Sequence, residues 1–309
     1  MFKVGVLKGG VSEEREISLR SGEAVYEALK ELGMDVSALD IVGATPTEFR
    51  RQIGDSGIRV AFIALHGRFG EDGTAQQLLD EMGVAYTGSG PQASRRAMDK
   101  AAARECFGRA GLRVPAGYVV GVGSGERDAA SGRYPKVVKP VASGSSVGLS
   151  IVYEKEQLPA ALSMARKYDH RVLLEDYVAG RELTVGILGD LALPVVEIIP
   201  RREFFDYTAK YTAGITDYVV PAEMPQRLSA RAREVGLTAH RALGCRGASR
   251  VDMILDKEER LFALEVNTVP GMTRTSLLPR AAQAAGIGFG ELCRRILSTF
   301  ALPNEQIRS

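Results

Sequence analysis

Two acidic residues, an arginine and an asparagine near the C-terminus have the spacing of a metal site. The sequence SRVDMILDKEERLFALEVN predicts a β-hairpin with its turn centred at 258–259, which places Asp252 opposite Glu265 and Arg250 opposite Asn267. Side chains two apart on a strand share a face, so all four point the same way. Opposed carboxylates repel each other, and a divalent cation removes that repulsion. Oxygen ligands without His or Cys favour Mg²⁺ bound to substrate phosphates; a solvated hairpin face is the alternative.

A second segment, PKVVKPVASGSSVGLS, carries a lysine and then a loop of small residues. Lys139 ends a predicted strand, and Gly144, Ser145 and Ser146 follow it. Glycines let backbone N–H groups approach a phosphate, and hydroxyls and lysine add donors and positive charge. The lysine precedes the glycines, so this is no Walker A loop. The segment indicates either a phosphate-binding loop or a plain turn between strands.

Three single residues could also contact a substrate. Glu14 precedes a predicted helix, where it either caps the helix or binds a substrate ammonium group. His66 follows a buried strand, at the edge where α/β domains bind ligands, although a structural role is the alternative. Gly271 lies in the turn NTVPGM and could present its N–H to a substrate oxygen. The strand before Gly9 lacks the G-x-G-x-x-G spacing of a dinucleotide-binding site.

The first hundred residues alternate strand and helix patterns, which predicts a parallel α/β domain. The predicted elements are the strand Lys3–Leu7, the helix Ser18–Leu32, the strand Ile58–Leu65 and the helix Thr74–Met82. A single helix, Pro91–Ala110, is then expected to lead into a second domain.

The rest of the chain has short β-branched segments, which predict antiparallel strands. The expected elements are strands at 137–139, 172–174, 183–188 and 193–199, a helix at 157–167, a surface loop at 204–216, a helix at 225–243, the hairpin and two C-terminal helices. The length of the chain predicts two or three domains, and we place the first boundary near Arg95.

Composition excludes several classes of protein. The 309 residues include 40 Lys and Arg against 38 Asp and Glu, evenly spread, and no Trp, so no basic stripe indicates a nucleic-acid partner. The chain has no long apolar run and no signal-peptide pattern at its start, so we expect no membrane partner and a cytoplasmic location. Its three cysteines are far apart and predict neither disulfides nor a zinc site.

Taken together, these motifs closely resemble the D-alanine:D-alanine ligase family of the ATP-grasp fold, over essentially the whole chain. The matching segments are GGVSEEREISLRSG, ALHGRFGEDGT, YTGSG, MDK, VKPVASGSSVG, AKY, RVDM and EVNTVPGMT. The resemblance implies an α/β (α+β) protein of three domains. These are an N-terminal parallel α/β domain at 1–95, a small central α+β domain at 96–180 and a C-terminal α+β domain with an antiparallel sheet at 181–309.

The resemblance also implies a role for each matched residue. Those expected to contact ATP are Lys100, Lys139, Ser146, Glu175, Glu182 and Lys210. Those expected to bind magnesium are Asp252, Glu265 and Asn267. Those expected at the first D-alanine are Glu14, His66, Ser145, Tyr211, Arg250 and Gly271. Ser276 and the N–H of Leu277 are expected to bind the carboxylate of the second D-alanine.

The implied reaction joins two D-alanines through an acyl phosphate for peptidoglycan precursor synthesis. The implied cofactors are ATP and Mg²⁺, which Mn²⁺ can replace, and the implied assembly is a homodimer. Lys8 and Ser143 depart from the family pattern without removing a matched catalytic group.

Three alternatives remain. A depsipeptide ligase making D-alanyl-D-lactate shares the fold, and Tyr211 in the AKY motif argues against it. Another ATP-grasp ligase would use a different acid and amine. A nucleotide-binding regulator without catalysis would lack a metal ligand or an oxyanion donor, and none is missing.

Overall fold

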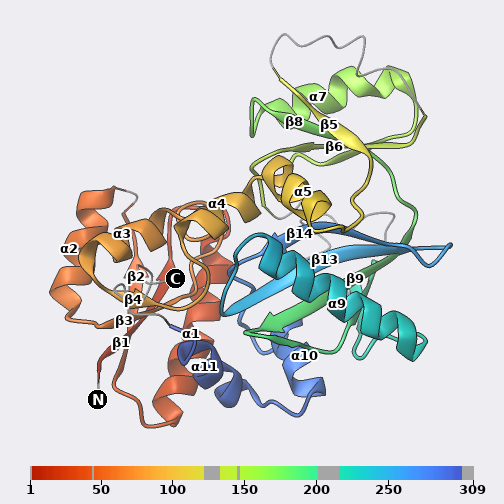
Figure 1. The fold of residues 1–309 in the computed structure, drawn as a ribbon. Helices are drawn as coiled ribbons and strands as arrows, with labels where there is room; N and C mark the ends of the chain where they lie inside the picture. Colours follow the sequence, from red (N-terminus) through yellow and green to blue (C-terminus); the bar gives the residue numbers. More distant parts are fainter. Residues whose placement is uncertain (1, 44, 122–132, 145–146, 201–215, 301–309) are drawn as a thin grey trace.

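The computed structural model describes residues 2–43, 45–121, 133–144, 147–200 and 216–300. It has three sheets, and each is the centre of one lobe of the molecule (Figure 1). Their strand orders are β2-β1-β3-β4, β5-β8-β6-β7 and β12-β11-β9-β13-β14, with β10 paired to β9.

The N-terminal sheet is parallel throughout, as the sequence predicts. Its lobe contains β1 (Val4–Gly9), α1 (Arg15–Glu31), β2 (Val36–Ile41), α2 (Pro46–Ser56), β3 (Val60–Ile63), α3 (Thr74–Met82) and β4 (Ala85–Tyr86). The strands β2 and β4 and the helix α2 were not predicted from the sequence. The start of α2 is nonetheless encoded locally, because Thr45 and Glu48 form a capping box around Pro46.

The prediction of a single helix over 91–110 is wrong. The chain forms α4 (Pro91–Met98) and α5 (Lys100–Arg109), separated by Asp99 in an extended conformation. The Asp99 carboxylate accepts a hydrogen bond from the N–H of Ala102 at 2.9 Å, and Arg171 binds it at 2.7 Å. Aspartate stabilises a helix start better than a helix interior, so it ends one helix and begins the next.

The other two sheets are antiparallel, as expected. The central lobe has β5 (Gly117–Val120), β6 (Lys136–Pro140), β7 (Ser150–Val152), η1 (Lys155–Gln157), α7 (Leu158–Arg166) and β8 (Val172–Asp176). The C-terminal lobe has β9 (Gly180–Leu188), β10 (Leu191–Ala192), β11 (Val196–Pro200), β12 (Thr216–Val219), α9 (Gln226–Ala242), β13 (Ala248–Asp256), β14 (Leu261–Asn267), α10 (Leu277–Ala284) and α11 (Phe289–Leu297). The loop expected at 204–216 lies, except for Thr216, outside the described residues.

The β13–β14 hairpin has the predicted register where the chemistry lies. Arg250 pairs with Asn267, and Asp252 pairs with Glu265. An irregularity after Asp252 shifts the remaining pairs by one residue, so that Met253 faces Ala263. The extra residue is typical of a β-bulge, which re-aims nearby side chains.

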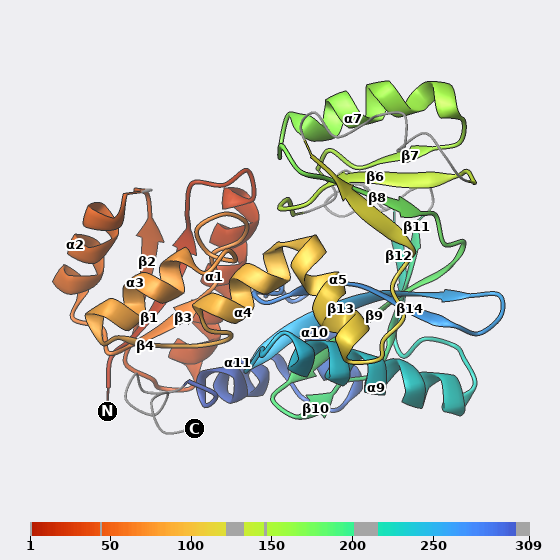
Figure 2. The same ribbon diagram turned by 45° about the horizontal axis from the view of Figure 1, so that its top comes forward.

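The C-terminal helices pack against the N-terminal lobe. α11 lies beside α1 in both ribbon views (Figures 1 and 2). One apolar core contains Val6 and Phe62 of the N-terminal sheet together with Leu278 of α10 and Leu292 of α11. The two ends of the chain therefore share a core, which fixes the side chains along the seam relative to one another.

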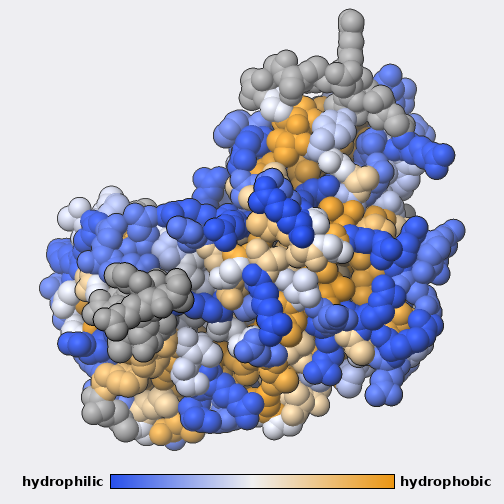
Figure 3. Space-filling model, viewed as in Figure 1, coloured by the Kyte–Doolittle hydropathy of each residue, from blue (hydrophilic) through white to orange (hydrophobic). Residues whose placement is uncertain are grey.

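Among the described residues, no helix is long and apolar enough to span a membrane. Figure 3 shows a mostly hydrophilic face, with some apolar residues at the surface over the central sheet. Tyr118 and Val119 of β5 belong to the exposed apolar residues of that sheet.

A buried histidine in the C-terminal lobe should make stability fall in mild acid. His240 of α9 lies 2.7 Å from the hydroxyl of Ser249, and burial, with nearby Arg241, lowers its pKa from 6.5 to about 4. Above pH 6.5 neither the folded nor the unfolded state is protonated. As pH falls from 6.5 towards 4, only the unfolded chain gains the proton, so unfolding is favoured by about 2 kcal/mol at pH 5.

Thermal unfolding at pH 7 and pH 5 tests this expectation. The drop in Tm between the two values should be smaller in His240→Gln than in the unsubstituted protein. Equal drops in the two proteins would show that His240 does not cause the acid sensitivity.

Candidate active site

Two adjoining cavities lie where the lobes meet. The first, of about 240 Å³, lies between the N-terminal lobe and the β13–β14 hairpin. The second, of about 460 Å³, lies between the central and C-terminal sheets. Lys100, Ser143 and Glu265 line both cavities, so a ligand in one can reach a ligand in the other at these residues.

The structure brings most of the sequence-predicted site residues together around these cavities. Those lining the first are Glu14, His66, Lys100, Arg250, Glu265, Asn267, Gly271, Ser276 and Leu277. Those lining the second are Lys100, Lys139, Glu175, Glu182, Asp252 and Glu265. Ser145, Ser146, Lys210 and Tyr211 lie outside the described residues.

Glu14 does not cap the helix that follows it. It occupies the N-cap position of α1 but makes no side-chain cap hydrogen bond. Its backbone N–H donates instead to the hydroxyl of Ser12, which donates to the carbonyl of His66 at 2.7 Å. Gly67 has a φ of +71°, and a side chain there would come within 2.8 Å of the Glu14 carboxylate. A glycine is therefore needed beside this acid.

The hairpin carboxylates are balanced by cations on the same face. Arg250 donates two hydrogen bonds to Asp252, at 2.9 and 2.7 Å, and Thr184 of β9 donates a third at 2.6 Å. Lys100 lies 3.4 Å from Glu265. Both carboxylates are thus held in place by positively charged partners.

These residues fit a magnesium ion that also binds phosphate oxygens. No group of three or more His, Cys, Asp or Glu side chains that could hold a metal occurs in the described part of the chain. Mg²⁺ at nucleotide sites uses one or two carboxylates and takes its other ligands from phosphates and water. Asp252 and Glu265, paired across the hairpin, supply that number, and the Asn267 amide adds a third oxygen.

A buried acid that lines the second cavity pairs with two cations. Glu175 of β8 is 3% exposed, and it pairs with Lys139 of β6 at 2.5 Å and with Arg104 of α5. Arg104 was not identified from the sequence. Because two cations offset one carboxylate, the group retains a positive charge towards the cavity, which suits a phosphate.

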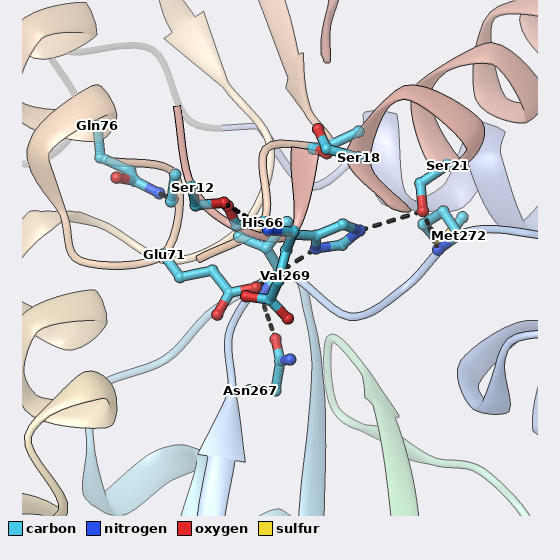
Figure 4. A network of polar contacts seen from close by, with 12 residues as sticks. Ser12, Ser18, Ser21, His66, Glu71, Gln76, Asn267, Val269 and Met272 are labelled. Carbon is cyan, nitrogen blue, oxygen red and sulfur yellow. Dashed lines mark hydrogen bonds and ion pairs between the residues drawn. The ribbon is translucent and has the colours of Figure 1, made fainter. Parts of the chain in front are cut away.

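His66 has a buried acidic partner that was also not identified from the sequence. Its Nδ1 lies 3.3 Å from the carboxylate of Glu71, and its Nε2 lies 3.1 Å from the hydroxyl of Ser21 (Figure 4). Burial raises the pKa of Glu71, and nearby Glu14 raises it further. The sequence offered one indication of this pair, because Glu71 follows His66 by five residues within the same glycine-rich segment.

The start of α10 forms the other wall of the first cavity. Ser276 precedes the helix, and its hydroxyl accepts from the N–H of Thr273 at 3.1 Å. Leu277 is the first residue of the helix, where backbone N–H groups have no partner within the helix. Such amides favour a carboxylate.

Two antiparallel sheets that enclose a cavity with lysines and opposed carboxylates are the arrangement of the ATP-grasp enzymes. Comparison with solved structures supports this class. The D-alanine–D-alanine ligase of Bacillus anthracis in complex with ATP superimposes with a TM-score of 0.84 at 34% identity, covering 96% of each chain. The fold class predicted from the sequence is confirmed.

Comparisons with protein families and curated proteins identify the particular family. Models described as the D-ala D-ala ligase N-terminus and C-terminus match residues 40–89 and 125–298. The D-alanine–D-alanine ligase of Geobacter sulfurreducens is 49% identical over 96% of this chain and 93% of its own length. That of Geotalea uraniireducens is 46% identical over 98% and 97%. The chain belongs to the D-alanine–D-alanine ligase family.

Proposed function

We propose that this protein joins two D-alanines to D-alanyl-D-alanine, converting ATP to ADP and phosphate, as a step of peptidoglycan precursor synthesis. The observation that carries the proposal is the junction of the two cavities at Lys100, Ser143 and Glu265. A carboxylate in the first cavity and the γ-phosphate of ATP in the second would meet there, between a cation and an acid that can hold magnesium. A ligase that activates a carboxylate needs this proximity.

ATP would lie in the second cavity. Lys100 and Lys139 would contact its phosphates, and Glu175 and Glu182 its adenine and ribose. Asp252, Glu265 and Asn267 would hold Mg²⁺, or Mn²⁺ in its place. When bound, the metal would supply positive charge that offsets the charge of the phosphate oxygens and helps to orient them. By family resemblance, Ser146 and Lys210 would add phosphate contacts.

The first D-alanine would lie in the first cavity with its ammonium group at Glu14, close to His66. Its carboxylate oxygen attacks the γ-phosphorus, the bond to the β-phosphate breaks, and ADP leaves. Arg250 and the Gly271 N–H stabilise charge on the acyl oxygen of the resulting acyl phosphate. By resemblance, Ser145 and Tyr211 would close this site.

The second D-alanine would bind through its carboxylate to Ser276 and the Leu277 N–H at the start of α10. Its amine nitrogen attacks the acyl carbon, the carbon–oxygen bond to phosphate breaks, and inorganic phosphate leaves. The amine proton passes to solvent. Excluding water from the cavity protects the acyl phosphate from hydrolysis.

A second candidate differs only in the acceptor. The VanG D-Ala:D-Ser ligase of Enterococcus faecalis superimposes with a TM-score of 0.84 at 30% identity, covering 96% of this chain and 98% of its own. The same fold therefore accommodates another second substrate. The lobes and the hairpin do not distinguish D-alanine from D-serine as the second substrate. An assay with both acceptors is therefore needed.

Phosphate release and product analysis test the proposal. Purified protein with ATP and Mg²⁺ is supplied with D-alanine, L-alanine, D-alanine plus D-serine, or D-alanine plus D-lactate. We expect turnover with D-alanine alone to give the dipeptide, and none with L-alanine. Preferential formation of D-alanyl-D-serine or D-alanyl-D-lactate would support the activation of the first D-alanine. It would show that D-alanine is not the preferred second substrate.

Three further features belong to this proposal. We propose domains at 1–95, 96–180 and 181–309, a homodimer, and a cytoplasmic reaction, since the cytoplasm supplies ATP. Light scattering during size-exclusion chromatography measures the oligomeric state directly.

A further inference from the structure

One buried hydroxyl connects the N-terminal lobe to the turn that carries Gly271. Ser21 of α1 is fully buried, and its Oγ accepts a hydrogen bond from the N–H of Met272 at 3.2 Å. The same oxygen lies 3.1 Å from Nε2 of His66, whose Nδ1 lies 3.3 Å from Glu71. Figure 4 shows a chain of contacts that runs from Glu71 through His66 and Ser21 to Met272. This line of contacts crosses the boundary between the N-terminal and C-terminal lobes.

A ring proton on Nδ1 of His66 satisfies every contact in this line. Ser21 accepts from the amide of Met272, so its own proton is available for Nε2 of His66. The imidazole proton then lies on Nδ1 and is donated to the carboxylate of Glu71. Each member thereby fixes the orientation of the next, and the buried carboxylate anchors the whole chain of hydrogen bonds.

The turn after β14 is held at both of its ends by side chains. The N–H of Val269 donates to the Asn267 side chain at 2.8 Å, and the N–H of Met272 donates to Ser21. Between these anchors lie Pro270, which has no N–H, and Gly271, which lines the first cavity. The peptide joined to Gly271 therefore takes its orientation from α1, 251 residues earlier in the chain.

We propose that Ser21, held by His66 and Glu71, is a positioning residue for the Gly271 N–H that stabilises the acyl oxygen. The proposal rests on the proposed ligase function. A donor of this kind contributes only when its direction is fixed before the reaction, because a small misplacement weakens the hydrogen bond to the developing charge. Ser21 sets that direction from the lobe that also carries Glu14.

The same helix provides a matched control. Ser18 lies one turn before Ser21, is equally buried, and donates a hydrogen bond to the carbonyl of Ala64 at 2.7 Å. Its hydroxyl contacts the end of the N-terminal sheet rather than the Gly271 turn. Ser18→Ala and Ser21→Ala thus each remove one buried hydroxyl from one helix, and only the second removes a contact to the turn.

Steady-state kinetics of both variants test the proposal, once the unsubstituted protein is seen to turn over D-alanine. We expect Ser21→Ala to lower kcat at least about 10-fold with KM for ATP changed less than twofold, and Ser18→Ala to keep kcat within about threefold. Equal kcat values for the two variants, or a parallel rise in KM for ATP, would overturn the positioning role. An unsubstituted protein that is silent with D-alanine would instead reject the proposed function.

Hydrogen exchange of the unsubstituted protein tests the inference without relying on a folded variant. A peptide covering 270–276 should contain a slowly exchanging amide at Met272, because that N–H is buried and bonded to Ser21. Exchange of every amide of this peptide at the rate of an open loop would overturn the proposal.

Discussion

Replacing Arg250 with alanine is expected to lower kcat about 100- to 1,000-fold, the range found when one oxyanion donor is removed. Arg250 lines the first cavity and binds both oxygens of Asp252, at 2.9 and 2.7 Å. The substitution removes the donor that we propose for the acyl oxygen. It also removes the partner of a mostly buried carboxylate that we expect to bind magnesium, so both halves of the site are affected.

Two further variants separate this effect from the loss of an ion pair. Arg181 of β9 makes an equivalent two-bonded pair with Glu197, at 2.7 and 2.6 Å, in the same sheet but outside both cavities. Arg181→Ala should retain kcat within about threefold. Arg250→Lys should recover only part of the activity, because lysine keeps the charge and loses the two-pronged geometry. Similar kcat values for Arg250→Ala and Arg181→Ala would contradict the assigned role.

Replacing Glu265 with glutamine is expected to lower activity at least about 100-fold when Mg²⁺ is limiting, with partial recovery as Mg²⁺ is raised. Glu265 faces Asp252 across the hairpin, lines both cavities and lies 3.4 Å from Lys100. Glutamine keeps the size of the side chain and removes the negative charge that we propose attracts the ion. Titration of kcat against Mg²⁺ measures the shift, and a chelator should abolish the activity of the unsubstituted protein.

Glu258 is the matched control for this experiment. It lies on the turn of the same hairpin, is half exposed and pairs with Arg260 at 3.0 Å. Glu258→Gln should leave the dependence on Mg²⁺ unchanged. If kcat depends on Mg²⁺ in the same way in Glu265→Gln and Glu258→Gln, Glu265 does not bind the metal.

The hairpin illustrates what local sequence can predict. Two-residue periodicity and a short polar turn were enough to pair Arg250 with Asn267 and Asp252 with Glu265, and the structure has both pairs. The irregularity after Asp252 was not predicted, because a β-bulge depends on packing against the neighbouring strand as well as on local sequence. The break at Asp99 was not predicted, because the apolar spacing of 91–110 fits one continuous helix and the capping role of Asp99 was not considered.

Contacts across the lobes could not be predicted from spacing. Ser21 and Met272 are 251 residues apart, and only the fold brings them together. Arg104 was missed because one arginine on a helix is usually solvated, whereas here it binds the buried Glu175. Ser18 and Ser21, three apart on the buried face of α1, are hydroxyls that must find partners, and that pattern is visible in sequence.

The proposed ligation can be tested most directly by following one oxygen atom. D-Alanine labelled with ¹⁸O in its carboxylate is incubated with the protein, ATP and Mg²⁺, and the released phosphate is analysed by mass spectrometry. Activation through an acyl phosphate predicts one ¹⁸O in each phosphate formed with a dipeptide, because the attacking carboxylate oxygen leaves with the phosphorus. Phosphate without the label would show that ATP is hydrolysed by water, and would contradict the proposed ligation.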